Sequence, residues 1–230
     1  PQKLVVSSRN LIQQETSYIL QPDLTTEQSV ALEARVDEKM NVSSLVVQIG
    51  GLAAYPTMIM RTTALDWLSN TIAHEWIHLY LSLRPLGMNY DRTPQLRTMN
   101  ETTASIAGDE IGKIMLERYY PELARRYENA SQLASLSDSP IPPGSYRRPF
   151  DFRAEMHKTR VRADELLAAG QIEQAEAYME SRRQVFWEQG YAIRKLNQAY
   201  FAFYGAYADL PGGAAGEDPV GPAVRQLRAQ

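Results

Sequence analysis

The sequence predicts a mainly α-helical α+β fold, built as a single domain over residues 1–230. Long stretches carry apolar residues at helical spacing, whereas short apolar runs flank a glycine pair near residue 50, as is typical of strands. Of the 230 residues, 44% are hydrophobic, which is enough for a sizeable core. Cysteine is absent, which excludes disulfides and cysteine-ligated metals. A net charge of −3 does not point to a nucleic-acid-binding surface, so we expect no nucleic-acid partner.

The N-terminal segment is predicted to be helical. Residues 4–19 carry apolar side chains at intervals that suggest an amphipathic helix, which Pro22 would end. Thr25 and Gln28 have the spacing of a capping box, in which each side chain bonds to the backbone of the other residue. This box predicts a second helix that runs to about Met40.

Two short strands and a long helix are expected next. The strands cover 45–49 and 55–60, with a sharp turn between them at Gly50 and Gly51. The segment 63–66 resembles a capping box with Asp in place of Glu, and Arg84-Pro85 would close the helix that follows. Within this helix, apolar residues recur at helical spacing at Leu65, Leu68, Ile72, Trp76, Leu79 and Leu83.

The rest of the chain divides into two predicted parts. An irregular loop over 84–97 leads to a helix over 99–119, so residues 1–134 would hold the sheet and two central helices. Residues 135–149 are rich in Ser and Pro and are expected to form a loop. Residues 150–230 would form a C-terminal helical subdomain that covers the site. Its expected breaks are Gly170 and Gly190, and Asp218-Pro219 would open a short terminal helix.

The segment His74-Glu75-Trp76-Ile77-His78 carries the strongest chemical signal. Residues four apart share one helix face, so both imidazoles can reach one Zn²⁺, with Glu75 beside a zinc-activated water. The plainer alternative is a pair of half-buried helix histidines with a solvated glutamate between them.

A catalytic zinc site needs a third protein ligand. Glu101 is the best candidate, because 22 residues separate it from His78 and two antiparallel helices would bring them together. Its alternative role is an N-terminal Glu in the first helical turn, stabilised by the helix dipole. His157 is interpreted as an ordinary surface histidine.

His-Glu-x-x-His followed by Asn100-Glu101 resembles the gluzincin metallopeptidases, as in thermolysin-like enzymes. The chain is also similar to the bacterial predicted aminopeptidases at 152–154, at 196–199 and at Tyr207, and the weak similarity spans about residues 65–229. The resemblance implies a zincin-like core in which His74, His78 and Glu101 hold Zn²⁺ and Glu75 is the general base of peptide-bond hydrolysis.

Two positions depart from these families. Thermolysin-like enzymes have an Asp four residues after the glutamate ligand, where this chain has Ser105. Asp109, one turn further, is an alternative partner for a ligand imidazole, and a surface charge is an equally good interpretation of it. The aminopeptidase family usually shows Asn-Asn-Ala where this chain has Gln198 as the second residue.

A peptidase also needs a donor for the oxyanion. Tyr207 is the first choice because it matches the resembled family, and Tyr204 is the second. With Asn197 and Tyr200 they have spacings of 3, 4 and 3, which places all four on one helix face. The alternative is an aromatic stripe packed in the core.

The segment 51–55 is expected to bind the substrate as an edge strand. An aminopeptidase needs a carboxylate for the free amine of its substrate, and no acidic residue lies between Val42 and Arg61. Exopeptidase and endopeptidase action therefore both stay open.

The predicted function is a zinc-dependent peptidase that acts on a peptide or protein substrate. The first alternative is a non-catalytic or latent zinc-binding helical module for partner or peptide binding, and the second is a hydrolase of non-peptide amides. Glu75 favours catalysis, because a structural site needs no general base and prefers cysteine. The start at Pro1 fits a trimmed or mature chain, and the resembled family suggests an extracytoplasmic location, with membrane anchoring outside these residues.

Overall fold

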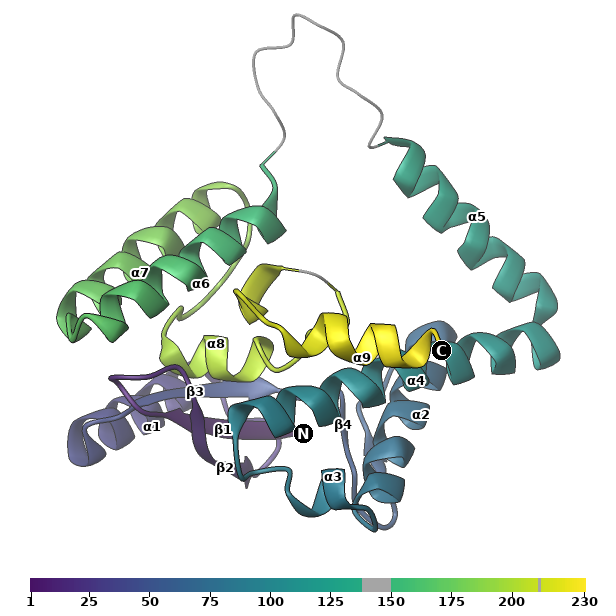
Figure 1. Cartoon of the computed structure of the whole chain (residues 1–230), viewed down its shortest axis with the longest axis horizontal. Helices are drawn as coiled ribbons and strands as arrows, with labels where there is room; N and C mark the ends of the chain where they lie inside the picture. The colour runs from purple at the N-terminus through teal and green to yellow at the C-terminus, as the bar shows by residue number, and fades with distance from the viewer. Residues whose placement is uncertain (138–149, 211) are drawn as a thin grey trace, which may run out of the picture.

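The computed structural model describes residues 1–137, 150–210 and 212–230. Helices dominate these ranges and surround a small antiparallel sheet, so the predicted α+β class is confirmed (Figure 1). Within the described ranges, every helix is too short or too polar to cross a membrane.

The N-terminal residues form strands where a helix was predicted. β1 (Gln2–Ser7) lies between β2 (Gln14–Leu20) and β3 (Ser43–Gln48), and both pairings are antiparallel. The helix prediction over 4–19 is wrong because its apolar positions belong to two strands and the turn between them. β1 is paired at both edges, and its consecutive residues Leu4, Val5 and Val6 are all buried, so the strand lacks the alternation of apolar and polar residues that would have predicted it.

The capping box at the next helix is confirmed. α1 (Thr26–Met40) begins where the Thr25 side chain accepts a hydrogen bond from the Gln28 amide at 3.2 Å. The Gln28 side chain accepts one from the Thr25 amide at 2.8 Å in return. β4 (Gly51–Leu52) and β5 (Met58–Ile59) follow β3 and pair with each other.

Two central helices carry the predicted motif residues. α2 (Leu65–Leu81) starts after Ala64 without a side-chain cap, so the capping box predicted there is absent. The predicted loop over 84–97 is wrong in part, because it contains α3 (Pro85–Met88) and the first turn of α4 (Pro94–Tyr119). Thr93 caps α4 by accepting a hydrogen bond from the Leu96 amide. Glu101 therefore lies about two turns inside α4, beyond the reach of an N-terminal dipole effect.

The C-terminal part is helical, as predicted. α5 (Pro121–Ser137) precedes it and includes the start of the predicted 135–149 loop, whose remainder lies outside the described residues. The next elements are α6 (Phe152–Ala168), α7 (Ile172–Glu188), α8 (Gln198–Tyr204), a 3-10 turn (Gly213–Ala215) and α9 (Val220–Arg228). Gly170 and Gly190 have φ of 72° and 88°, which explains the breaks. The Asp218 side chain accepts from the Val220 and Gly221 amides at the start of α9, but Pro219 is the residue before the helix and not, as predicted, its first residue.

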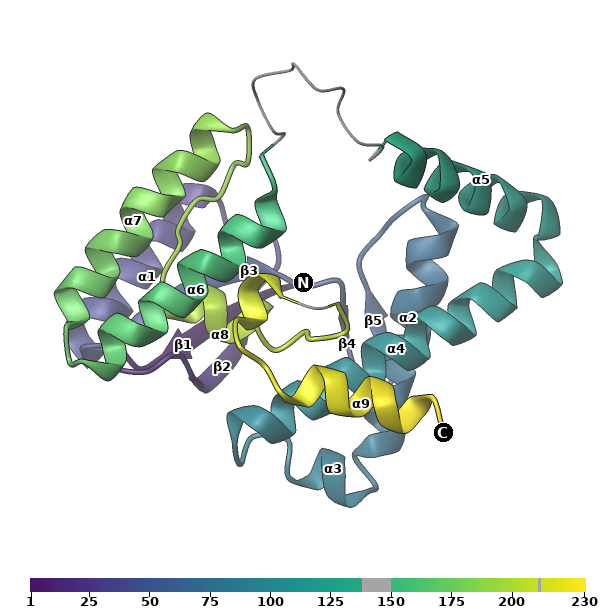
Figure 2. The ribbon, with the colours of Figure 1, turned by 45° about the horizontal axis from the view of Figure 1, so that its top comes forward.

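α6 and α7 form a hairpin at one side of the molecule, and α4 and α5 lie at the other (Figure 2). The buried centre of the hairpin includes Met156, Met179 and Phe186. α8 packs on the face of β1 and β3 that carries Val5 and Leu45. α8 and the segment after it, rather than the α6–α7 hairpin, reach the cavity described below. The prediction that the C-terminal helical subdomain as a whole covers the site is therefore too broad.

Candidate metal centre

The structure brings the three predicted ligands together. α2 presents His74 and His78 on one face, and α4 presents Glu101 opposite them. The two Nε2 atoms lie 3.0 Å apart, and Glu101 Oε2 lies 3.5 Å from His74 Nε2 and 3.3 Å from His78 Nε2. This donor set can hold a metal ion. The predicted surface histidine, His157, lies elsewhere, with its Nε2 atom 3.3 Å from Glu217 Oε1.

Small residues allow α2 and α4 to approach closely at this point. A Cβ atom added to Gly108 would lie 3.0 Å from the Asn70 carbonyl oxygen and 3.1 Å from His74 Cβ. A Cβ atom at Gly112 would clash with the Asn70 side chain and lie 2.9 Å from the Asn70 amide. Because ordinary contacts between carbon atoms lie near about 3.5–4.0 Å, larger residues would push the helices apart. The glycines therefore set the distance between Glu101 and the histidines.

Asn100 orients one of the histidines. Its side chain is buried, with 1% exposed, and Oδ1 lies 2.7 Å from His78 Nδ1. A carbonyl oxygen can only accept, so Nδ1 of His78 carries the proton and Nε2 presents a lone pair towards Glu101. Burial acts to lower the pKa of His78, but the Glu101 carboxylate outweighs it and raises this pKa above 6.5.

Glu101 is held by a second group of polar side chains. The Tyr90 hydroxyl donates to Glu101 Oε1, and Arg97 Nε donates to the Tyr90 oxygen at 3.2 Å. Arg97 also donates to the Ala202 carbonyl at 2.8 Å, which ties α4 to α8. Burial acts to raise the pKa of Glu101, but the two histidines and Arg97 hold it well below its usual value. No local sequence pattern links Tyr90 or Arg97 to Glu101, so neither residue is predicted from the sequence.

The two candidate partners of a ligand imidazole, Ser105 and Asp109, both line the cavity beside the histidines. Asp109 is exposed and accepts a hydrogen bond from Asn70 Nδ2 at 2.9 Å. Burial raises the pKa of Asp109 above its usual value, and the nearby His74 acts in the opposite direction. The imidazole partner seen in the structure is Asn100, which directly precedes Glu101 in the sequence.

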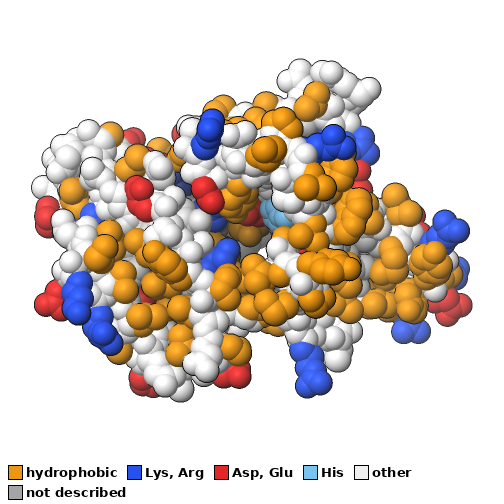
Figure 3. Space-filling model, turned by 90° about the horizontal axis from the view of Figure 1, so that it is seen from below, with side chains coloured by type: hydrophobic (Ala, Val, Ile, Leu, Met, Phe, Trp, Pro, Cys, Tyr) orange, Lys and Arg blue, Asp and Glu red, His pale blue; other side chains and the backbone are white. Residues whose placement is uncertain are grey.

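A cavity of about 680 Å³ opens over the triad. Figure 3 shows a histidine side chain at the bottom of a hollow surrounded by hydrophobic side chains. Glu75 lines this cavity and is 7% exposed, and burial raises its pKa above the usual value. A Cβ atom at Gly51 would lie 2.6 Å from Glu75 Cγ, so only glycine leaves room for this carboxylate.

β4 borders the cavity with a free backbone edge. The Met60 amide donates to the Gly50 carbonyl at 2.8 Å, which makes residues 50 and 60 a hydrogen-bonded pair. In an antiparallel ladder the next pair, Gly51 and Ile59, is non-hydrogen-bonded. The N–H and C=O groups of Gly51 therefore point away from β5. The expected substrate segment 51–55 is thus only partly a strand, with its open edge at Gly51.

Two of the three candidate oxyanion donors line the cavity. The Tyr207 ring centroid lies 6.2 Å from that of His74, and Tyr204, 41% exposed, lies further along the wall. Burial, followed by the charge of Glu101, raises the pKa of Tyr207 well above 10, so its hydroxyl keeps its proton.

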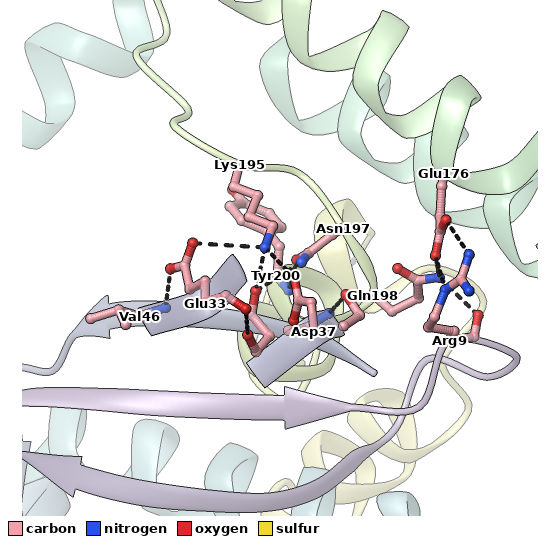
Figure 4. A network of polar contacts seen from close by, with 12 residues as sticks. Arg9, Glu33, Asp37, Val46, Glu176, Lys195, Asn197, Gln198 and Tyr200 are labelled. Carbon is pink, nitrogen blue, oxygen red and sulfur yellow. Dashed lines mark hydrogen bonds and ion pairs between the residues drawn. The ribbon is translucent and has the colours of Figure 1, made fainter. Parts of the chain in front are cut away.

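Asn197 is not among the residues that line the cavity. Figure 4 shows it within a network of polar contacts beside Tyr200 and Gln198. Its Nδ2 donates to the Ser44 carbonyl at 3.0 Å, and its Oδ1 caps α8 by accepting from the Tyr200 amide at 3.0 Å. The prediction that Asn197 shares one helix face with the three tyrosines is wrong, because α8 covers only Gln198–Tyr204. Asn197 therefore joins a polar network that links α1, β3 and α8, in which Arg194 bonds to the buried carboxylate of Glu33.

The charged lining of the cavity includes two residues that the sequence does not predict. Lys3 of β1 and Asp209, which follows α8, line it together with Asp109. No local pattern indicates either residue, because each comes from a segment far from the motif helices. Asp209 raises the pKa of Asp109 further, after burial.

Comparisons with models of known families, with curated proteins and with solved structures find no match to this chain. The gluzincin resemblance stays a prediction from short motifs.

Proposed function

We propose that this chain is a zinc-dependent peptidase, with a zincin-like core formed by α2, α4 and the β4–β5 pair. The observation that carries the proposal is the convergence of His74 Nε2, His78 Nε2 and Glu101 Oε2 beside the buried carboxylate of Glu75. A structural site would have no use for a general base in the cavity.

Zinc fits the donor set. The three separations of 3.0, 3.3 and 3.5 Å bracket the edge of a tetrahedron, about 3.3 Å for ligand bonds of about 2.0–2.1 Å. Glu101 is 4% exposed, and its Oε2 has no hydrogen-bond partner among the described residues. A buried, charged oxygen without a donor is costly unless a cation satisfies it. Two histidines and one glutamate are the ligands of several catalytic zinc sites.

The side chains around the site have distinct proposed roles. Bound zinc would act as a Lewis acid on the scissile carbonyl and on water. Glu75 accepts a proton from the attacking water and passes it to the leaving amine, and its raised pKa suits this exchange. The Tyr207 hydroxyl donates to the developing oxyanion. The free N–H and C=O of Gly51 hold the substrate backbone as an added strand.

The proposal is tested by incubating the zinc-loaded protein with a mixed peptide library and identifying the cuts by mass spectrometry. We expect cuts that a chelator abolishes and that vanish in Glu75→Gln, but persist in Glu38→Gln, whose carboxylate is exposed on α1. The cut positions distinguish exopeptidase from endopeptidase action. Zinc binding without any cleavage would refute the peptidase and support the non-catalytic zinc module.

Phenylalanine variants distinguish the roles of Tyr207 and Tyr204. Losing one oxyanion donor typically lowers kcat by about 10²- to 10³-fold, so we expect this loss in Tyr207→Phe with little change in KM. Tyr204→Phe is the matched control, because its ring is equally aromatic but more exposed. Equal losses in both variants would refute the assignment.

A further inference from the structure

We propose that Lys3 is the carboxylate-recognition residue of this cavity, so that the preferred substrates carry a carboxylate next to the scissile bond. The carboxylate is either an acidic side chain or the C-terminus of the substrate. This inference rests on the proposed peptidase function and adds the substrate class to it.

The strand register places Lys3 at the cavity. Lys3 is opposite Val47 in the β1–β3 ladder, and Val47 belongs to the sheet face that packs on α8. Residues directly opposite each other share one face, so the Lys3 stem runs along this apolar face and its ammonium enters the cavity. Lys3 is the only lysine or arginine among the described residues that line the cavity.

The ammonium has charges nearby but no direct partner. Its pKa is lowered by burial, and Glu101 and Glu75 act in the opposite direction, which places the charge near the reaction centre. No hydrogen bond or ion pair links it to any part of the chain that the structure describes. A half-buried cation without a partner is costly to keep, and an anionic ligand would satisfy it.

The charges of the cavity are also separated along its length. Asp109 lies eight residues after Glu101 on α4, which corresponds to about 12 Å along the helix axis. Asp109 interacts with Asp209 and His74, whereas Lys3 interacts with Glu101, Glu75 and residues near the start of α4. A substrate carboxylate would be attracted to the Lys3 end and repelled from the aspartate end. The scissile bond, between the two ends, would then lie beside this carboxylate.

The test uses peptides of one sequence that carry either Glu or Gln beside the scissile position, each with a free or an amidated C-terminus. Binding of dansyl-labelled peptides to the zinc-loaded Glu75→Gln protein is measured by fluorescence, and kcat/KM is measured with the active protein. A charge-assisted hydrogen bond predicts about 10- to 100-fold tighter binding of the carboxylate form. The Glu/Gln pair and the acid/amide pair show whether the carboxylate is a side chain or a terminus.

Lys3→Met keeps the apolar stem and should remove this preference without changing zinc content. Lys3→Arg should keep the preference, and Lys39→Met, an exposed lysine of α1, is the matched control. Equal binding of all four peptides by the Glu75→Gln protein, in which Lys3 is intact, overturns the inference, and this result does not depend on whether any Lys3 variant folds. A preference that survives in Lys3→Met, or zinc loss in that variant, overturns it too. Absence of cleavage alone would refute the peptidase, while the binding data would still decide the role of Lys3.

Discussion

Replacing Asn100 with alanine should weaken zinc binding by about 10- to 100-fold, which is about 1.4–2.7 kcal/mol. The side chain is 1% exposed and accepts the Nδ1 proton of His78 at 2.7 Å. Alanine would leave this proton without an acceptor in a buried place, at a cost of about 1–3 kcal/mol. The imidazole would then lose both its orientation and part of its basicity towards the metal.

The matched variant is Asn100→Asp, which keeps an acceptor oxygen at the same place and adds a negative charge. Zinc affinity is measured for both variants by competition with a chelator of known affinity, and thermal unfolding reports the fold. We expect Asn100→Asp to bind zinc as tightly as the unmodified protein, or more tightly. Equal losses in the two variants, or no loss in Asn100→Ala, would refute the assigned role of the His78 hydrogen bond.

Three other predictions concern the helix contact, the edge strand and pH. Gly108→Ala should lower the free energy of unfolding by about 1–3 kcal/mol through overpacking, partly offset by about 1 kcal/mol of helix propensity. It should also lower zinc affinity, because it separates α4 from His74. An unchanged affinity in chelator competition would contradict this. Gly51→Ala should displace Glu75 and lower kcat while zinc content stays constant, and an unaltered kcat would show that the carboxylate has room to move. Only the neutral imidazole binds zinc, and the pKa of His78 is raised above 6.5. The zinc affinity should therefore begin to fall at a pH above 6.5 as the pH is lowered. A constant zinc affinity from about pH 8 to about pH 6 would rule this out. In the metal-free protein the same shift stabilises the fold below pH 6.5, and this stability is lost as the pH rises through the folded pKa.

Features that depend only on neighbouring residues could be predicted from the amino-acid sequence. The four-residue spacing of His74 and His78 places both rings on one face of any helix, whatever surrounds it. The capping box at Thr25 fixed the start of α1 in the same local way. Gly170 and Gly190 marked the breaks between helices because their backbone needs a positive φ.

Local periodicity wrongly predicts a helix for the first two strands, because their pairing partners lie far away in the sequence. Leu4 pairs with Tyr18 and Val46, and only this pairing decides that the segment is extended. Two short strands and the turn between them can also place apolar residues at helical intervals. Local periodicity therefore does not distinguish this arrangement from a helix.

The completion of the site depends on contacts between segments that are distant in the sequence. The close approach of α2 and α4 at Gly108 places Glu101 opposite the histidines, and no local pattern specifies that distance. The tertiary structure also places Asn197 outside the cavity, as the cap of α8. It places Lys3, from the first strand, in the cavity wall. Helix spacing and capping act within a few residues of the chain. The charge, depth and orientation of the cavity depend on side chains from distant segments, and packing alone brings these together.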